Sequence, residues 1–184
     1  LLHFLVMNKY RTEKILSAKL IDYLKEAMGH GLVNEIKIGY RSYYNFVHEQ
    51  IYEKLYSFLS EEEASDLHFI LAQYIEKSYS RDEDVFLLAY HYNKAQKFEK
   101  AYDYFKKAGA TAEKRLAYLD AYNYYVKAYK LLNQNENVNK NDLLNLGLKI
   151  STYSWMYDDF QKNIEFLIDL ENIALDLNLD EQLA

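Results

Sequence analysis

The 184-residue chain contains no cysteine and no proline. Without cysteine it can form no disulfide, thiolate nucleophile or cysteine-ligated metal site, and this absence favours a cytoplasmic location. Because proline breaks helix interiors, its absence is typical of a chain that is helical along most of its length. Tyrosine, by contrast, occurs 20 times. We interpret this excess, together with the many Asn and Lys residues, as the codon usage of an AT-rich genome.

Long apolar runs are missing as well. No run approaches the roughly 18 uncharged residues that a membrane helix needs, so we expect no membrane partner. The apolar opening Leu1–Met7 lacks the basic leader and the small-residue cleavage site of a signal peptide. Since the chain does not begin with methionine, we expect it to be an internal piece of a longer protein.

Motifs for catalysis and for phosphate binding are also missing. The five glycines never form G-x-x-x-x-G-K-[ST] or G-x-G-x-x-G, and no two histidines have the H-x-x-x-H or H-E-x-x-H spacing of metal ligands. No nucleophile, base and orienting group can be combined into one site. We therefore predict that this segment is not an enzyme and has no catalytic, cofactor-binding or metal-binding residues.

The N-terminal part of the chain has the order of predicted elements that is typical of a winged helix. Apolar residues at helical spacing predict two short helices within residues 10–28, which Gly29-His30-Gly31 ends. Leu32–Ile38 and Tyr43–Val47 then predict two strands joined by a turn, and we expect no other β-structure. Residues 1–57 are thus predicted to form a winged-helix-like module that is truncated at its N-terminus.

Residues 58–184 are predicted to be helical. Ser60-Glu61-Glu62-Glu63 is a capping box, and Ser80–Glu83 repeats this signal for a helix start. Residues 133–141 have no apolar stripe and predict an exposed loop, followed by helices around 143–157 and 160–177. The faces expected to be buried on the first two helices are Leu67, Ile70, Leu71, Tyr74 and Ile75, and Val85, Leu88, Ala89 and Tyr92.

A repeat at an offset of 20 residues is the most informative feature of the sequence. Both copies have the successive spacings 3, 9, 4 and 3; they are Ala89, Tyr92, Ala101, Phe105 and Ala108, then Gly109, Ala112, Ala121, Tyr125 and Ala128. Small residues let two antiparallel helices approach closely, and an aromatic side chain fills the space beside them. The repeat predicts helices near 83–95, 98–116 and 118–132, with the middle helix packed against both neighbours.

These spacings resemble the tetratricopeptide repeat, although the closing proline is missing and the second unit begins early. The fold class expected from this resemblance is mainly α: tetratricopeptide-like antiparallel hairpins in residues 58–184, behind the winged-helix-like module. Phe46–Tyr56, FVHEQIYEKLY, resembles the F-x-H-x-x-I-x-E-x-x-Y signature that follows the nucleotide-binding domain and winged helix of STAND-type ATPases. The resemblance spans roughly residues 15–132. The other short segments that match the family pattern, in the same order, are Leu67-His68, Ala72, Leu88–Tyr92, Lys100-Ala101 and Ala108-Gly109.

Similar segments occur in multidomain adenylate or guanylate cyclases, in sensor kinases and in regulators of the maltose-activator type. The resemblance implies a non-catalytic interaction and coupling segment, in which residues 1–57 contact an ATPase domain and residues 81–184 bind a partner protein. It also implies that the histidines on three predicted helices are helix-start or packing residues whose rings bond backbone carbonyls; these are His48, His68 and His91.

Two alternatives stay open at this point. One is a free-standing tetratricopeptide-type adaptor that binds peptides, for which the tyrosine-rich helices could line a groove, although most of these tyrosines are expected to pack between helices. The other is a winged-helix transcription regulator. Charge disfavours it: residues 1–57 carry a net +2 and residues 58–184 a net −8, and in the would-be recognition helix Asp22 and Glu26 offset Lys19 and Lys25. We therefore expect no nucleic-acid partner.

The acidic runs Asp158-Asp159 and Glu61–Glu63 could be proposed as general acids or cation ligands. Both stand where helix N-termini are expected, and the helix dipole favours negative charge there. We interpret them as solvated helix caps.

Overall fold

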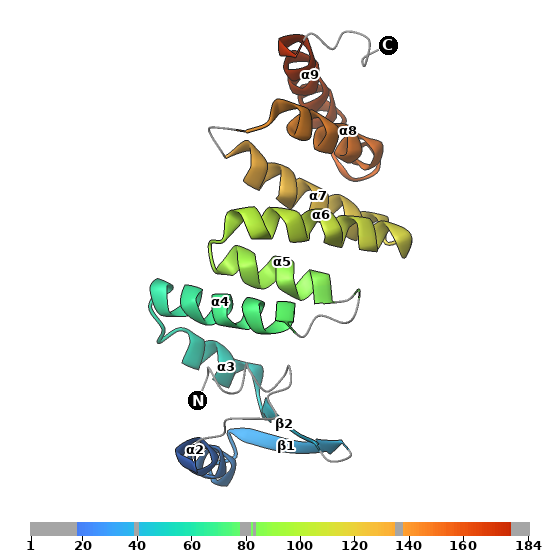
Figure 1. Ribbon diagram of the computed structural model, residues 1–184. Coiled ribbons are helices and arrows are strands. Elements are labelled where there is room, and N and C mark those ends of the chain that lie inside the picture. Colours follow the sequence, from blue (N-terminus) through green and yellow to red (C-terminus); the bar gives the residue numbers. More distant parts are fainter. Residues whose placement is uncertain (1–17, 39–40, 78–81, 83, 135–137, 178–184) are drawn as a thin grey trace. The chain divides into compact units, whose positions relative to one another are not determined.

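The computed structural model describes residues 18–38, 41–77, 82, 84–134 and 138–177. In these residues the chain is mainly helical, with eight helices, α2–α9, and one two-stranded antiparallel sheet (Figure 1). Within the described ranges, no helix is long and apolar enough to cross a membrane. Contacts divide the chain into two units, Leu1–Ser78 and Tyr79–Ala184. The predicted boundary after residue 57 stays a prediction.

The first unit contains the predicted pair of strands. Helix α2 (Ala18–Gly29) is followed by β1 (Val33–Ile38) and β2 (Arg41–Phe46), with Val33 opposite Phe46 in an antiparallel register. The second strand begins two residues earlier than predicted. Residues 10–17, where a further helix is predicted, lie outside the described residues. The small core at this point consists of Leu24, Ala27 and Val33, with Met28, Tyr44 and Phe46 against them.

Helix α3 (Glu49–Tyr56) leads to α4 (Glu61–Lys77), which begins with the predicted capping box. The Glu63 backbone N–H donates to Ser60 Oγ at 3.2 Å, and the Ser60 N–H donates to Glu63 Oε2 at 2.8 Å. Two backbone donors that have no partner inside the helix are thereby satisfied. The helix start predicted from four letters is confirmed.

The buried face predicted for α4 is partly wrong. Leu71 and Ile75 are buried as predicted, but Ile70 is 38% exposed, and His68 and Ala72 are buried instead. The His68 ring lies 3.0 Å, Nε2 to Oη, from the Tyr56 hydroxyl of α3. An imidazole ring that is hydrogen-bonded in this way can be buried at little cost in free energy. The buried face of α4 therefore includes His68, which a search for apolar residues alone does not detect.

The second unit is a series of helices in which each packs against the next. They are α5 (Asp84–Lys94), α6 (Phe98–Lys114), α7 (Tyr118–Asn133), α8 (Lys140–Tyr157) and α9 (Phe160–Asp176). Helix α6 packs against both α5 and α7, as predicted, and the predicted bounds are correct to within a few residues. The capping signal at Ser80–Glu83 falls largely outside the described residues. In Figure 1 these helices run from green to red.

All ten residues of the sequence repeat are buried between α5, α6 and α7. Nine of them are at most 5% exposed, and Gly109 is buried as well. A Cβ atom built on Gly109 would lie 2.5 Å from Cε1 of Tyr125, so the helix backbones approach closely there. For the small residues of the repeat, the interpretation that they let helices pack closely is confirmed.

Three of the described helices end in the same backbone conformation, with one residue at positive φ. Only one of these residues is a glycine, so the sequence indicates the conformation at only one of the three ends. Gly31, Gln96 and Leu116 have φ of 66°, 54° and 59°, and each stands two residues after the last residue of α2, α5 or α6. At each end the N–H of the next residue bonds the carbonyl five positions earlier, as Lys97 N to Tyr92 O does at 3.0 Å. This is the Schellman motif, which glycine usually terminates. Gln96 and Leu116 are 20 residues apart, which is the offset of the sequence repeat. The repeat therefore extends to the turns that follow α5 and α6.

Replacing Leu116 with glycine is expected to raise the free energy of unfolding by about 0.5–1 kcal/mol, because a left-handed conformation strains any residue with a Cβ. Leu116 is 70% exposed, so little buried surface is lost. The matched control is Leu119→Gly on α7, at a residue 51% exposed, which should lower stability by about 1 kcal/mol. Urea unfolding measures both, and equal losses would contradict the prediction.

Helix α9 has two apolar faces. Leu170 and Ala174 are buried together with Leu144 of α8. A second set of large apolar side chains recurs at helical spacing on the other face and is exposed: Phe160, Ile164, Leu167, Ile168 and Leu175. This set leaves α9 with a large apolar surface that no described residue covers.

Candidate partner-binding site

The three histidines lie on three different helices, His48 and His68 in the first unit and His91 in the second. His48 is exposed at the N-cap of α3 and forms no side-chain cap bond, whereas His68 and His91 are buried on α4 and α5. The Tyr56 hydroxyl is a partner of His68 that the sequence did not indicate. In the described part of the chain, no three His, Asp or Glu side chains are grouped so that they could hold a metal ion.

The acidic runs differ in their roles. Glu61–Glu63 lie in the first turn of α4, and Asp159 caps α9 by accepting from the Gln161 N–H at 2.8 Å, as predicted. Asp158 has another role, because it follows the last residue of α8 and accepts a hydrogen bond from the Tyr122 hydroxyl of α7. Burial and this bond raise the pKa of Tyr122. Asp158 therefore joins α7 to the turn between α8 and α9.

The tyrosines lie mainly between helices. Tyr92 of α5 stacks on Tyr104 of α6 with ring centroids 5.5 Å apart, and both are buried. Tyr118 of α7 stacks on Tyr153 of α8 at 6.0 Å. Tyr23 and Tyr90 are exceptions, at 55% and 47% exposed, and Tyr118 is 40% exposed in spite of its stack.

A half-buried carboxylate, Glu113, connects three helices. Its Oε2 accepts from the Tyr125 hydroxyl of α7 at 2.8 Å, and its Oε1 accepts from Lys149 Nζ at 2.6 Å and from the Tyr153 hydroxyl, both of α8. Burial alone would raise the pKa of Glu113, but these three hydrogen bonds and the charge of Lys149 outweigh it and lower the pKa below 4.5. Partial burial and the bond to Glu113 raise the pKa of Tyr153 to about 12. With both oxygens bonded, Glu113 holds helices together.

Replacing Glu113 with glutamine is expected to lower the free energy of unfolding at neutral pH by about 1 kcal/mol, the net value of a hydrogen bond. Because the folded-state pKa is lowered, the contribution of Glu113 is present above pH 4.5 and is lost as the pH falls through the folded-state pKa. The difference between the wild type and the variant should therefore shrink in acid. Urea unfolding across this pH range checks it, and a difference that grows in acid would contradict it.

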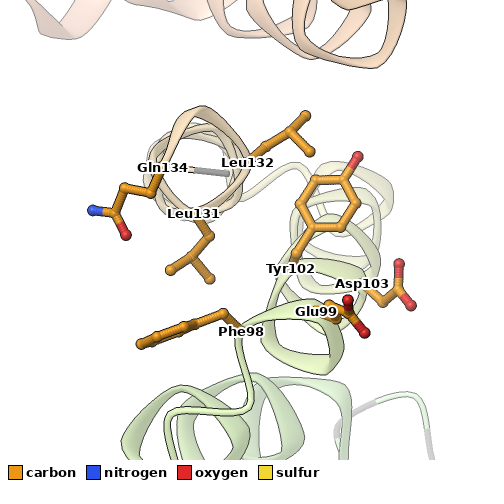
Figure 2. A pocket seen from close by; sticks show the side chains of 7 residues that line it. All are labelled: Phe98, Glu99, Tyr102, Asp103, Leu131, Leu132 and Gln134. Atoms are coloured by element: carbon orange, nitrogen blue, oxygen red, sulfur yellow. The ribbon is translucent and has the colours of Figure 1, made fainter. Parts of the chain in front are cut away.

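The α6–α7 hairpin carries a pocket of about 340 Å³ between the first turns of α6 and the last turn of α7. Its lining residues are Phe98, Glu99, Tyr102, Asp103, Leu131, Leu132 and Gln134. Figure 2 shows Leu131 pointing toward Phe98 and the ring of Tyr102 standing between the helices. Glu99 and Asp103 lie next to each other on the α6 side, and Gln134 turns its amide outward.

The chemistry of the pocket is apolar with an acidic edge. Phe98 is 49% exposed, which is unusual for a ring that only fills a core. Glu99 and Asp103 are exposed, and neither carboxylate forms an ion pair within the ranges that the structure describes. Ligand sites range from about 300 to 1,000 Å³, so this pocket is at the small end. It suits one side chain of a partner better than a nucleotide.

Sequence reasoning did not find this pocket. Its two sides come from helix ends 33 residues apart, Phe98 and Leu131, and their contact depends on the turn between α6 and α7. The signal that could have indicated it is Phe98 itself, a large apolar residue at a helix start between Lys97 and Glu99.

Comparison with family models, with curated proteins and with solved structures gives no match for this chain. The functional argument therefore depends on the residues and on their geometry.

Proposed function

We propose that this chain is a non-catalytic interaction and coupling segment of a larger STAND-type signalling ATPase, one that carries a nucleotide cyclase or kinase domain. In this proposal, a winged-helix-like module precedes tetratricopeptide-like hairpins. The observation that carries the proposal is the burial of all ten repeat residues between α5, α6 and α7. Stacked hairpins of this kind present long surfaces to partners and contact mainly their own neighbours.

The signature segment supports a coupling role, because its aromatic residues touch in a series. The Phe46 ring of β2 lies 6.1 Å from Tyr52, Tyr52 lies 5.8 Å from Tyr56, and Tyr56 contacts His68 of α4. Packed rings move together more readily than solvated ones, since a shift in one displaces the next. A displacement at the strands can thereby reach α4 through residues of the signature.

The second unit supports a role in binding. Glu113 fixes α6, α7 and α8 to one another, and the pocket on the α6–α7 hairpin and the exposed face of α9 are both left open to a partner in the described residues. In the proposal, residues 1–57 contact the ATPase domain and residues 81–184 bind the partner.

The gene that encodes the chain provides the test. A phosphate-binding loop in the reading frame upstream of Leu1 is the expected result, and the purified 184-residue chain should release no phosphate from ATP and form no cyclic nucleotide. Turnover by the purified chain would overturn the proposal. A start codon close to Leu1 would instead support a free-standing tetratricopeptide-type adaptor.

A winged-helix transcription regulator is less well supported. On α2, exposed Lys25 is accompanied by exposed Asp22 and Glu26, and a DNA-binding helix needs several uncompensated cations. Salt-dependent retardation of duplex DNA in a gel would favour this alternative.

A further inference from the structure

We infer that the exposed apolar face of α9 binds an amphipathic helix of a partner protein, and that this helix carries one basic side chain within its apolar stripe. The inference rests on the proposed function, in which residues 81–184 bind a partner, and it names the surface that binds and the chemistry of the segment that is bound.

The exposed apolar face of α9 is long enough for a second helix. It consists of side chains at helical spacing: Phe160, Ile164, Leu167, Ile168 and Leu175. Leu170 and Ala174, which pack with Leu144 of α8, lie on the adjoining side of the helix. At 1.5 Å per residue, the face is about 22 Å long from Phe160 to Leu175. A partner helix of about four turns would cover it.

The stacking of helices in the second unit favours a helix as the occupant. Helices α6, α7 and α8 each pack against the helix before and the helix after. Helix α9 stands at the end of this series (Figure 1), where it packs against α8 and touches Tyr129 of α7 through the ring of Phe166. In helical-repeat proteins, a terminal helix that faces water has a polar outer face. The outer face of α9 is apolar instead, so it continues the packing surface of the stack.

A single carboxylate within this face determines the charge that the partner needs. Glu171 is exposed and stands four residues after Leu167, three after Ile168 and four before Leu175, so it lies among them. No lysine or arginine occurs in residues 163–176, and within the described ranges Glu171 forms no ion pair. A helix that covers the face takes this carboxylate out of water, and burying an unpaired charge is costly. A basic side chain opposite Glu171 offsets this cost and fixes the register of the two helices.

A second copy of the chain fits this face less well than a basic partner. The one basic residue of α9, Lys162, is nine residues from Glu171 and therefore lies on the opposite side of the helix. If two copies paired through α9, each Glu171 would meet apolar side chains or the same carboxylate of the other copy. Helix α9 contains four acidic residues and one basic residue, so the two helices would also repel each other.

The test is an NMR titration of the ¹⁵N-labelled 184-residue chain with two helical peptides of about 18 residues. Both peptides have a stripe of leucines at helical spacing and alanine and glutamine elsewhere; one has a lysine at the centre of the stripe and the other a glutamate. We expect saturable shifts at the backbone amides of residues 160–176, and the lysine peptide should bind about tenfold more tightly or better. Absence of saturable shifts in α9, or equal affinity for the two peptides, would overturn the inference.

Charge reversal tests the role of Glu171. Glu171→Lys should reverse the preference, so that the glutamate peptide binds this variant more tightly. The matched control is Glu165→Lys, the same change on the same helix at an exposed residue about a third of a turn away around the helix axis. This control should keep the preference for the lysine peptide. If both variants reversed the preference, net charge would select the peptide and the inference would be wrong.

A leucine pair tests the apolar part of the face. Leu167→Gln should weaken binding of the lysine peptide about tenfold, because the leucine would be buried by the partner helix. Leu119→Gln on α7 is the control, since the exposed fractions of Leu167 and Leu119 are 49% and 51%. It should leave the affinity within about twofold of the wild type. Equal losses in the two variants would contradict the assignment of the binding to α9.

Two further measurements identify the source of the helix. The first uses the chain extended by whatever the reading frame encodes downstream of Ala184. Binding of the lysine peptide that persists in the extended chain supports a partner, whereas loss of binding would show that the parent protein covers the face itself. The second is sedimentation of the free 184-residue chain. A dimer that Leu167→Gln dissociates would assign the face to a second copy and would overturn the inference.

These tests fail separately from the test of the proposed function. If the lysine peptide does not bind but a phosphate-binding loop lies upstream of Leu1, the inference is wrong and the proposed function stands. If the lysine peptide binds and the gene starts near Leu1, the inference stands and the face of α9 is a binding surface of an adaptor.

Discussion

Replacing Tyr92 with alanine is expected to lower the free energy of unfolding of the second unit by about 3–5 kcal/mol, the range for removing a buried aromatic side chain. Tyr92 is 1% exposed and stacks on Tyr104, with Lys100 Nζ 5.3 Å from its ring centroid. The cavity left between α5 and α6 would be lined by side chains held on two helices, so it can collapse only in part. Urea unfolding followed by circular dichroism measures the loss.

Tyr90 provides the matched control for this prediction. It is the same residue type on the same helix, but it is 47% exposed. Tyr90→Ala should therefore cost about 1 kcal/mol or less. If the two variants lost the same stability, the stack between α5 and α6 would not be the source of the stability of this unit.

Replacing Gly109 with leucine is expected to cost about 2–3 kcal/mol, although leucine is the better helix former by under 1 kcal/mol. The new Cβ would lie 2.5–2.8 Å from three ring atoms of Tyr125. This ring cannot easily move aside, because its hydroxyl donates to Glu113 at 2.8 Å and the residue is 5% exposed. The overlap must therefore be relieved by separating α6 from α7.

Gly29 serves as the control here. A Cβ built on Gly29, at the end of α2, would have no heavy atom within 4 Å. Gly29→Leu should change stability by less than about 1 kcal/mol. The decisive comparison is thermal unfolding of the two variants side by side, and a Gly109 variant as stable as the Gly29 variant would show that the helices are not in close contact.

The helices of the second unit were predictable because the same helical spacing of apolar residues determines both where a helix forms and which of its faces is buried. Val85, Leu88, Ala89 and Tyr92 recur at helical spacing and are all buried on α5, where Asp84 and His91 are buried as well. On α4 the apolar pattern left out His68, whose burial depends on the Tyr56 hydroxyl of another helix. A polar residue buried by a specific partner cannot be recognised from its own helix.

The turns and the pocket were not predictable for a related reason. Gln96 and Leu116 adopt a conformation that usually belongs to glycine, and what keeps them there is the packing of the helices on either side. The pocket depends in turn on one of these reversals, which brings the end of α7 back to the start of α6. Local propensity carries no information about either.

The 20-residue spacing between Gln96 and Leu116 has an evolutionary consequence. Helix α6 is the second member of one copy of the repeat and the first member of the next, so moving along by one copy moves along by one helix. Successive helices reverse direction at each turn. Gain or loss of a single copy would therefore reverse the chain direction of every helix that follows it. Gain or loss of two copies would leave the direction of those helices unchanged. Viable length variants of this segment should differ by even numbers of copies.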